Sequence, residues 1–227
     1  MLATAAQRGF SLIETAIVLV VVALLMGGVL RGQELVTQAR IRDVMNDLSG
    51  VTAAYQFYFD RYKALPGDDL NAGARWIPFN AKSGGGDGKV SGKYMDAPPF
   101  DPTAGGFTVD NSQNESLNFW WHLRIAGFVA GPATGPGAAS QPGNASGGIL
   151  GVQVSGLDFT GLIACESNVP EKIAGAVDTQ LDDQLPASGQ VRGYLQSAGN
   201  EDVMGKAPNS AAYGGAGSFS YVVCKRL

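Results

Sequence analysis

The chain has 227 residues, with 16 lysines and arginines against 20 aspartates and glutamates, which gives a net charge of −4 at pH 7. This acidic balance repels the phosphate backbone of nucleic acids, which argues against nonspecific nucleic-acid binding as the main task. Charged residues make up only 16% of the chain, and 32 residues are glycine. The composition is typical of a loop-rich, β-containing domain outside the cytoplasm.

A membrane-length apolar segment follows a short polar leader at the N-terminus. The sequence Arg8-Gly9-Phe10-Ser11-Leu12-Ile13-Glu14 leads into an apolar stretch that ends at Leu30. As a helix, Phe10 to Leu30 would be about 31 Å long, which is enough to cross a bilayer core of about 30 Å. Glu14 is the one ionisable side chain in this stretch. Such a group costs on the order of 3 kcal/mol in a membrane, so it needs a partner.

Cleavage between Gly9 and Phe10 would create that partner, because it leaves a free amino group on Phe10. The first residue of a helix and the residue four positions later lie on the same face. A neighbouring helix, offset along its axis, could therefore place Glu14 against the Phe10 ammonium group of another copy. The pattern predicts a segment that associates with copies of itself.

This N-terminal pattern resembles the class III leader and N-terminal methylation motif of type IV pilins and pseudopilins. The resemblance implies that a prepilin peptidase cuts after Gly9, that Phe10 is N-methylated and that Glu14 sets the register of assembly. It also implies a precursor in the bacterial inner membrane with its head in the periplasm. The mature protein would then join an extracellular or periplasmic filament.

Three other interpretations of the N-terminus compete with this one. A secretory signal has an apolar region of about 7–15 residues and a small-residue cleavage site. Here Glu14 interrupts a longer stretch, and no Ala-x-Ala site follows Leu30. A simple single-pass anchor leaves Glu14 without a role, and a soluble core helix is the least favoured interpretation.

The next segment has the periodicity of an amphipathic helix. Its apolar residues recur in steps of three and four: Ile41, Val44, Leu48, Val51, Tyr55, Tyr58 and Tyr62. The helix should end before Leu65-Pro66-Gly67, because proline disfavours helix in the residue before it. The same periodicity allows a dimeric coiled coil. Upstream, the resemblance implies local melting at Gly27, Gly28 and Gly32 when the subunit enters a filament.

We therefore predict an α+β, pilin-like fold in which a long N-terminal helix packs on an antiparallel β-sheet. The expected regions are a leader (1–9), a transmembrane or filament-core helix (10–30), the amphipathic half of the helix (31–64) and a globular head (65–227). Alternating apolar residues predict strands at two places: Val152, Val154, Leu157 and Phe159, and Phe219, Tyr221 and Val223.

Two glycine-rich stretches are expected to be loops. Residues 83–92 faintly resemble a calcium loop, but only Asp87 fits the required ligand pattern. We expect no metal and no cofactor, with Asp87 as the one candidate calcium ligand. Residues 127–148 carry no charge and predict a long surface loop, which could be a variable tip or carry glycans.

Two short helices are predicted in the head. Ser112-Gln113-Asn114-Glu115 fits a capping box before a helix from Leu117 to Ala126, which Gly127 would stop. Leu117, Trp120 or Trp121, and Leu123 are interpreted as core residues, and the alternatives for this aromatic cluster are a ligand platform or a contact between subunits. A second helix is predicted to start at Asn168-Val169-Pro170-Glu171, with Pro170 in its first turn. The acids Asp178, Asp182 and Asp183 that follow are read as caps or solvated carboxylates, with a metal site as the alternative.

The cysteine and histidine content excludes common catalytic and metal centres. His122 is the single histidine, and the chain has no Cys-x-x-Cys, nucleophile elbow or phosphate loop, so we expect no enzyme. The resemblance places the head outside the cytoplasm, where a disulfide between Cys165 and Cys224 is the natural outcome. A C-terminal cysteine pair also resembles the disulfide-bounded region of many type IV pilins.

The predicted function is that of a structural subunit, a minor or specialised pilin of a type IV pilus-like filament. Its partners would be the inner membrane, the prepilin peptidase and other pilin copies. One alternative is a pseudopilin of a type II secretion system. Another is a monomeric membrane-anchored protein that binds a surface ligand through Trp120, Trp121 and the glycine-rich loop.

Overall fold

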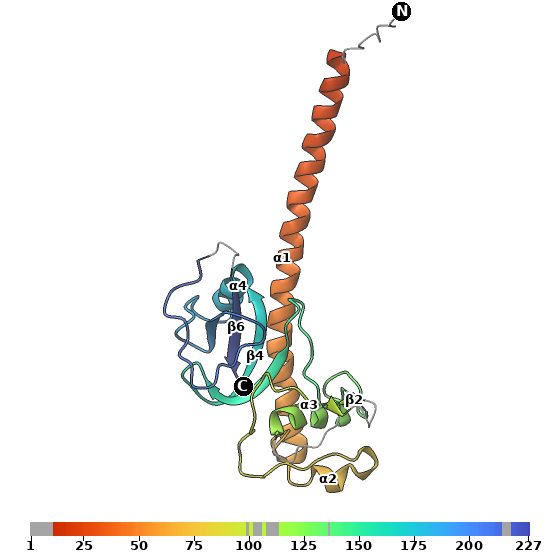
Figure 1. Ribbon diagram of the computed structural model, residues 1–227, viewed down its shortest axis with the longest axis vertical. Coiled ribbons are helices and arrows are strands. Elements are labelled where there is room, and N and C mark those ends of the chain that lie inside the picture. The colour runs from red at the N-terminus through yellow and green to blue at the C-terminus, as the bar shows by residue number, and fades with distance from the viewer. Residues whose placement is uncertain (1–10, 99, 102–105, 108–113, 136, 215–218) are drawn as a thin grey trace, which may run out of the picture. The chain divides into compact units, whose positions relative to one another are not determined.

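The computed structural model describes residues 11–98, 100–101, 106–107, 114–135, 137–214 and 219–227. The chain divides into two compact units, Met1–Ala39 and Arg40–Leu227, and each is described by itself. Helix α1 (Leu12–Tyr62) contributes to both units (Figure 1). The second unit, called the head below, holds all the other elements. The leader expected at residues 1–9 lies outside the described residues.

The first unit consists, in its described part, of the N-terminal portion of α1. Its sequence is rich in leucine, alanine and valine and contains no proline, so nothing interrupts the helical hydrogen bonds. Its most apolar 18-residue window has a mean hydropathy of 2.5, and none of that window is buried. By length and composition this portion could cross a membrane. The helix is continuous through Gly27, Gly28 and Gly32.

Within the head, α1 buries the predicted apolar stripe. The fully buried positions are Ile41, Val44, Leu48, Val51, Ala54 and Tyr58. Tyr55 and Tyr62, also predicted, lie at the margin of the stripe and are only partly buried. The helix ends at Tyr62, and Lys63 has a positive φ of 53°, which turns the chain before Pro66 as predicted.

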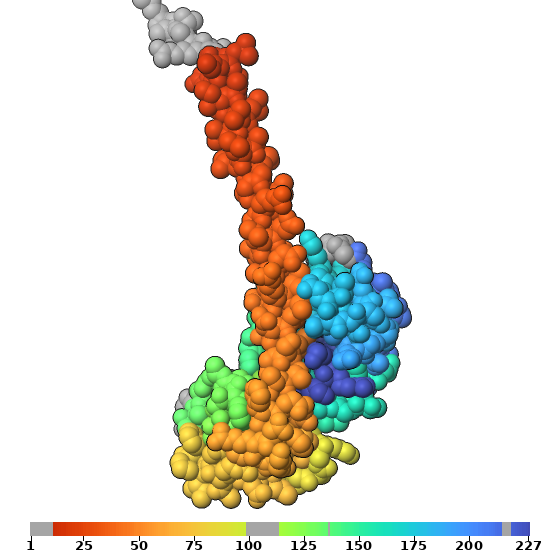
Figure 2. Space-filling view, turned by 180° about the vertical axis from the view of Figure 1, so that it is seen from behind, coloured from red at the N-terminus to blue at the C-terminus, as the bar shows by residue number. Residues whose placement is uncertain are grey.

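A four-stranded antiparallel sheet packs on this part of α1, which confirms the predicted α+β architecture (Figure 1). Its strands are β3 (Leu150–Gly156), β4 (Phe159–Pro170), β5 (Val191–Gln196) and β6 (Ser220–Arg226), in the order β3-β4-β6-β5. One face contributes Val152, Ala164 and Val223 to the core against α1. Seen from behind in Figure 2, the head's part of α1 remains uncovered between the sheet and α3.

The opposite face of the sheet has a second core. Cys165 and Cys224 stand directly opposite each other on β4 and β6 and form the predicted disulfide. Both are fully buried, together with Tyr94, Val203 and Val222. The disulfide therefore ties the last strand to the centre of the sheet, under the loops that carry Tyr94 and Val203.

The sequence did not predict β5 or the short pair β1 (Phe100–Asp101) and β2 (Gly106–Phe107). In β5 only Val191 and Gly193 are buried, so its apolar alternation is weak. Two further short elements, the helix α2 (Ala72–Arg75) and the 3-10 helix η1 (Ile77–Phe79), follow α1.

The helix boundaries in the head correct two predictions. Helix α3 spans Glu115–Ile125, and its N-cap is Asn114, whose side chain accepts from the N–H of Leu117. The predicted capping box therefore does not form with Glu115 as its third helical residue, and Ser112 lies outside the described residues. Helix α4 spans Glu171–Leu181 with Pro170 as its N-cap, because β4 continues through Pro170.

The segment at 127–148 is only partly a surface loop, which corrects a third prediction. Ala138 and Ala139 are buried and pack with Leu117 and Trp121 in a small apolar cluster. Gly143 and Ile149 form an isolated antiparallel bridge. Small uncharged side chains let this segment lie close to α3, so its composition reflects packing as well as exposure.

Candidate functional site

The apolar surface of the first unit is the first candidate site. Its large side chains are exposed along the whole helix, with Leu12 at 89%, Leu24 at 73% and Leu30 at 67%. An apolar surface this continuous marks a membrane or protein interface. Nothing in the described part of this unit covers it.

Glu14 lies in the first turn of α1, at the N-terminal end of this apolar surface. The N–H of Ser11 donates to Glu14 Oε2 at 3.4 Å, and the N–H of Glu14 donates to the Ser11 carbonyl at 3.0 Å. A carboxylate is favoured near a helix N-terminus, where unpaired N–H groups carry partial positive charge. Gly9 and Phe10, the predicted cleavage and methylation positions, lie outside the described residues, so the proposed pairing of Glu14 with a Phe10 ammonium group stays a prediction.

The head holds a second candidate site, where three motifs of the sequence meet. The chain after α1 (Leu65-Pro66-Gly67-Asp68-Asp69), the glycine-rich stretch at 83–92 and the start of α3 are tied together by buried polar groups. His122 of α3 accepts at Nδ1 from the N–H of Gly67 at 2.9 Å and contacts the Lys82 carbonyl through Nε2 at 2.7 Å. These contacts assign the neutral tautomer with the proton on Nε2. Burial lowers the pKa of His122 to about 4, which keeps it neutral near pH 7.

Asp69 forms a buried polar group with α1 and α2. Tyr58 donates to Asp69 Oδ2 at 2.7 Å, and Arg75 pairs with the same oxygen at 2.5 Å. Burial works to raise the pKa of Asp69, but the hydrogen bonds from Arg75 and Tyr58 outweigh it, so the pKa is lowered. The carboxylate is thus held charged, and it fixes the end of α1 to α2.

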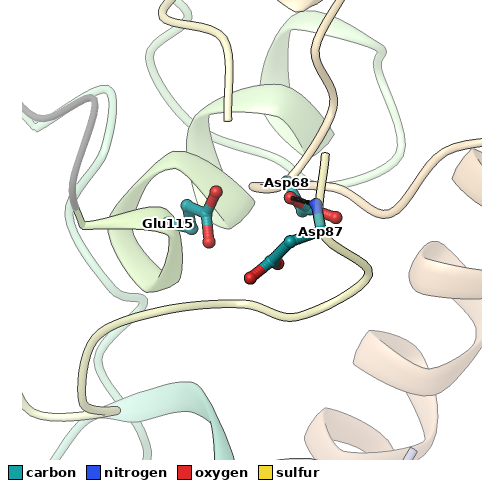
Figure 3. A group of neighbouring side chains, drawn as sticks. All are labelled: Asp68, Asp87 and Glu115. Carbon is teal, nitrogen blue, oxygen red and sulfur yellow. Dashed lines mark hydrogen bonds between the residues drawn. The ribbon is translucent and has the colours of Figure 1, made fainter. Parts of the chain in front are cut away.

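Asp68, Asp87 and Glu115 form a cluster in which one carboxylate oxygen from each lies within 4.8 Å of the others (Figure 3). Glu115 comes from the first turn of α3, while Asp68 and Asp87 come from loops. Asp68 and Glu115 are buried, and Asp87 is exposed. The structure therefore brings the one predicted calcium-ligand candidate, Asp87, next to two acids that the sequence analysis did not single out for this role.

Backbone N–H groups of the glycine-rich stretch surround two of these carboxylates. Asp68 accepts from the N–H groups of residues 86, 87 and 88, and Glu115 accepts from those of residues 85 and 91. Glycine is required because a Cβ at Gly84 would lie 2.2 Å from the Gly67 carbonyl oxygen, and Gly86 has a φ of 69°. A calcium loop presents oxygens to its ion, whereas this loop presents donors to carboxylates. That polarity supports our proposal that the cluster holds the loop in place rather than a metal.

The second acidic group, Asp178, Asp182 and Asp183, also accepts hydrogen bonds from nearby donors. Asp178 is buried and accepts from Tyr213 Oη at 3.0 Å and the Gln184 N–H at 2.9 Å. Asp182 accepts from the N–H groups of residues 190 and 191, and Asp183 accepts from Leu185 N–H and Ser188 Oγ. Burial raises the pKa of Asp178 to about 6. These partners support the interpretation of the three acids as turn caps.

The tryptophans of α3 are core residues. Trp120 and Trp121 are 1% and 4% exposed, and Trp120 belongs to the core around α1. Trp121 packs on Ala138 and donates its Nε1–H to the Ala133 carbonyl at 2.9 Å. This burial removes the side chains on which the ligand-platform alternative depended.

Asn144 precedes Ala145-Ser146 in a potential glycosylation sequence, and its side-chain amide forms hydrogen bonds within the fold. Its Nδ2 donates to the Ser167 carbonyl at 2.8 Å, and its Oδ1 accepts from the N–H groups of Ser146 and Gly148. A glycan on this amide would break the bond to Ser167. The structure therefore argues against Asn144 as a glycan site.

Sequence reasoning missed Glu166, a buried acid on the β4 face that packs on α1. Neither of its oxygens has a hydrogen-bond partner among the described residues. Burial, with the nearby negative charges of Asp47 and Asp43, raises its pKa to about 9. Glu166 follows the apolar run Ile163-Ala164-Cys165, which is the sequence signal that could have placed it on a buried strand.

Comparison with known proteins bears on the N-terminus. Residues 4–30 match the family model for the prokaryotic N-terminal methylation motif, which confirms the resemblance predicted from Arg8 to Glu14. Neither the curated proteins nor the solved structures contain a significant match to this chain. The motif points to a structural protein that associates with membranes and assembles with other subunits.

Proposed function

We propose, from a leader of the class III type shared by type IV pilins and pseudopilins, that this chain is a minor or specialised subunit of a type IV pilus-like filament. The prepilin peptidase would cut after Gly9, and Phe10 would then be N-methylated. The precursor would wait in the inner membrane with its head in the periplasm. The mature subunit would join a filament of its own copies or of other pilins, outside the cell or in the periplasm.

The observation that carries this proposal is the position of Glu14 on an uncovered apolar helix that coincides with the methylation motif. The motif match covers residues 4–30, and α1 begins within it, at Leu12. A carboxylate at this place is costly in a membrane unless a cation neutralises it. Packing beside another copy supplies both the apolar cover and the Phe10 ammonium group.

Features of the head support a pilus rather than a secretion piston. The buried disulfide fits an oxidising compartment and stabilises the C-terminal strand. Removal of nine leader residues from the 227-residue chain leaves a 218-residue subunit. In our proposal this length and the uncharged stretch at 127–148 mark a specialised subunit. A chromosomal deletion separates the two systems, because a pilus subunit is needed for surface filaments and a pseudopilin for protein secretion.

The test is replacement of Glu14 by alanine in the native host. We expect Glu14→Ala to reduce the chain in sheared filaments by about tenfold or more, while membrane insertion and leader cleavage continue. Glu34→Ala is the matched control, because Glu34 lies on the same helix and makes only an exposed ion pair with Arg31 at 3.5 Å. Immunoblots of sheared and membrane fractions, with mass spectrometry of the N-terminus, give the readout. Normal filament incorporation of Glu14→Ala would contradict the register role.

A further inference from the structure

A cleft of about 260 Å³ opens in the head beside α1. Asp47 and Gly50 of α1 line one part of it. Most of the remaining lining is apolar and includes Trp120 of α3, Phe128 after α3 and Leu150 at the start of β3. The cleft is large enough for a long side chain, and its single ionisable lining residue is Asp47.

Gly50 has no explanation within the head. It is exposed in the interior of α1, and a Cβ built there meets nothing within 4 Å. Glycine destabilises a helix interior relative to alanine, so an unneeded glycine here weakens the helix. The missing side chain at the rim of the cleft leaves room for another molecule to approach the helix closely.

Asp47 places a carboxylate in this cleft, and it has no ion-pair partner among the described residues. Asp43 lies one turn before Asp47 on α1 and adds a second negative charge nearby, whereas the fully buried Glu166 of β4, whose pKa is raised to about 9, is neutral near pH 7. The ion pairs found among the described residues involve none of these three acids. The cleft therefore favours a cationic occupant.

We propose that the cleft receives an arginine or lysine side chain from a second copy of this chain. The aliphatic stem of that side chain packs on the apolar lining, and its charged end lies beside Asp47. The absence of a Cβ at Gly50 lets the second copy approach α1. Exposed arginines on α1, such as Arg42 and Arg61, offer suitable groups. This inference rests on the proposed function, since it names a contact between filament subunits.

The geometry of such a contact suits a filament. The cleft on one copy receives a side chain from a different surface of the next copy, so the two contacting surfaces are not the same. A contact of this kind leaves one free cleft and one free cation at the two ends of the assembly, and it continues until the ring closes or a helix forms. In this arrangement the head makes a contact between subunits of its own, in addition to the packing of the N-terminal apolar segments.

Photo-crosslinking in the native host tests the occupant directly. A photoreactive amino acid is placed at Ala130, an exposed residue at the cleft, at Gln56 on an exposed part of α1 outside it, and at Leu24 in the apolar segment. We expect adducts of twice the monomer mass from Ala130 and Leu24, with weak or no adducts from Gln56. Mass spectrometry should place the Ala130 adduct next to an arginine or lysine of a second copy.

Each other outcome overturns a defined part of the account. Self-adducts from Leu24 without any from Ala130 overturn the cleft contact and leave the filament function standing. Adducts from Ala130 to a different protein, or equal adducts from Gln56, also overturn the cleft contact. The absence of any adduct from Leu24, either to a second copy or to another pilin, overturns the proposed function and the cleft contact with it.

Substitutions separate docking from folding. In the detergent-solubilised full chain, Gly50→Ala should raise the unfolding midpoint by about 2–4 °C, because alanine favours the helix. In cells it should lower filament incorporation by about tenfold. Ser49→Ala is the matched control and should leave incorporation unchanged. Asp47→Asn should lower incorporation, whereas Asp60→Asn, an exposed acid on the same helix, should not. Normal incorporation of Gly50→Ala, or a lowered midpoint, overturns the proposal.

Discussion

The two parts of α1 show how one regular helix can serve two purposes. From Leu12 to Ala39 its apolar side chains point in all directions and are exposed, whereas from Arg40 to Tyr62 they form a single buried stripe. Helical hydrogen bonding is local and similar in both parts. The arrangement of apolar residues around the axis differs, and it determines whether the partner is a sheet within the head or a surface outside the subunit.

Loss of the disulfide should give the largest effect, and it should be confined to the head. Cys165→Ala with Cys224→Ala opens a loop between residues 59 apart in sequence, and the chain-entropy model predicts a loss of roughly 4 kcal/mol. Urea unfolding of the solubilised chain, followed by tryptophan fluorescence, measures this loss. Membrane insertion of the first unit should be unchanged, and impaired insertion would contradict the independence of the two parts.

Matched leucine substitutions in α1 test the comparison most directly. Leu48 is fully buried and Leu24 is 73% exposed. Leu48→Ala should cost about 2–5 kcal/mol of head stability, since it removes buried apolar area and leaves a cavity. Leu24→Ala should change head stability by less than about 0.5 kcal/mol and should instead weaken self-association. Similar losses of head stability for the two variants would contradict the division of the helix.

Glu166 predicts a pH dependence at the contact between α1 and the sheet. Its pKa is raised from 4.5 to about 9 in the folded protein, so between these values the folded state binds more protons than the unfolded state. Stability from this group is therefore full below about pH 4.5 and is lost as the pH rises towards 9. Glu166→Gln should be more stable than the native chain at pH 8, on the order of 2 kcal/mol, with the gap closing towards pH 4.

Thermal unfolding at pH 4, 6 and 8 measures this difference. Asp60→Asn serves as a control, because its exposed carboxylate should shift the unfolding midpoint little at any pH. A constant difference between Glu166→Gln and the native chain across the pH range would contradict the assignment of a raised pKa.

The smallest effect is expected from calcium. Asp68 and Glu115 already accept backbone N–H groups, so millimolar calcium should not shift the unfolding midpoint relative to a chelator. Saturation of a true site at 100 times its Kd would add about 2.7 kcal/mol of stability, a shift of several degrees. A shift of that size, abolished by Asp87→Asn, would make Asp87 a calcium ligand.

Local pattern was enough to locate the long helix, its end near Pro66, and strands β3 and β6 of the sheet. In the stripe from Ile41 to Tyr58 the apolar residues recur with the helical period, and near Val152 and Tyr221 apolar and polar residues alternate. In each case the sequence pattern indicates which face of the element is buried. Strand β5 escaped prediction because only Val191 and Gly193 are buried in it. The cap positions at Asn114 and Pro170 differ from prediction because neighbouring chain segments, and not the motif alone, decide where a helix starts.

By itself, the sequence determined the N-terminal motif, the membrane-length apolar segment and the amphipathic stripe, because each depends on residues within a few turns of one helix. The tertiary structure decided what the remaining acids do. Asp68 and Glu115 are 47 residues apart in sequence, yet they hold one glycine-rich loop, and Glu166 meets Asp47 only when the sheet lies on α1. Whether a carboxylate receives N–H donors, a cation or nothing depends on the neighbours that folding brings to it, and a single sequence does not encode those neighbours locally.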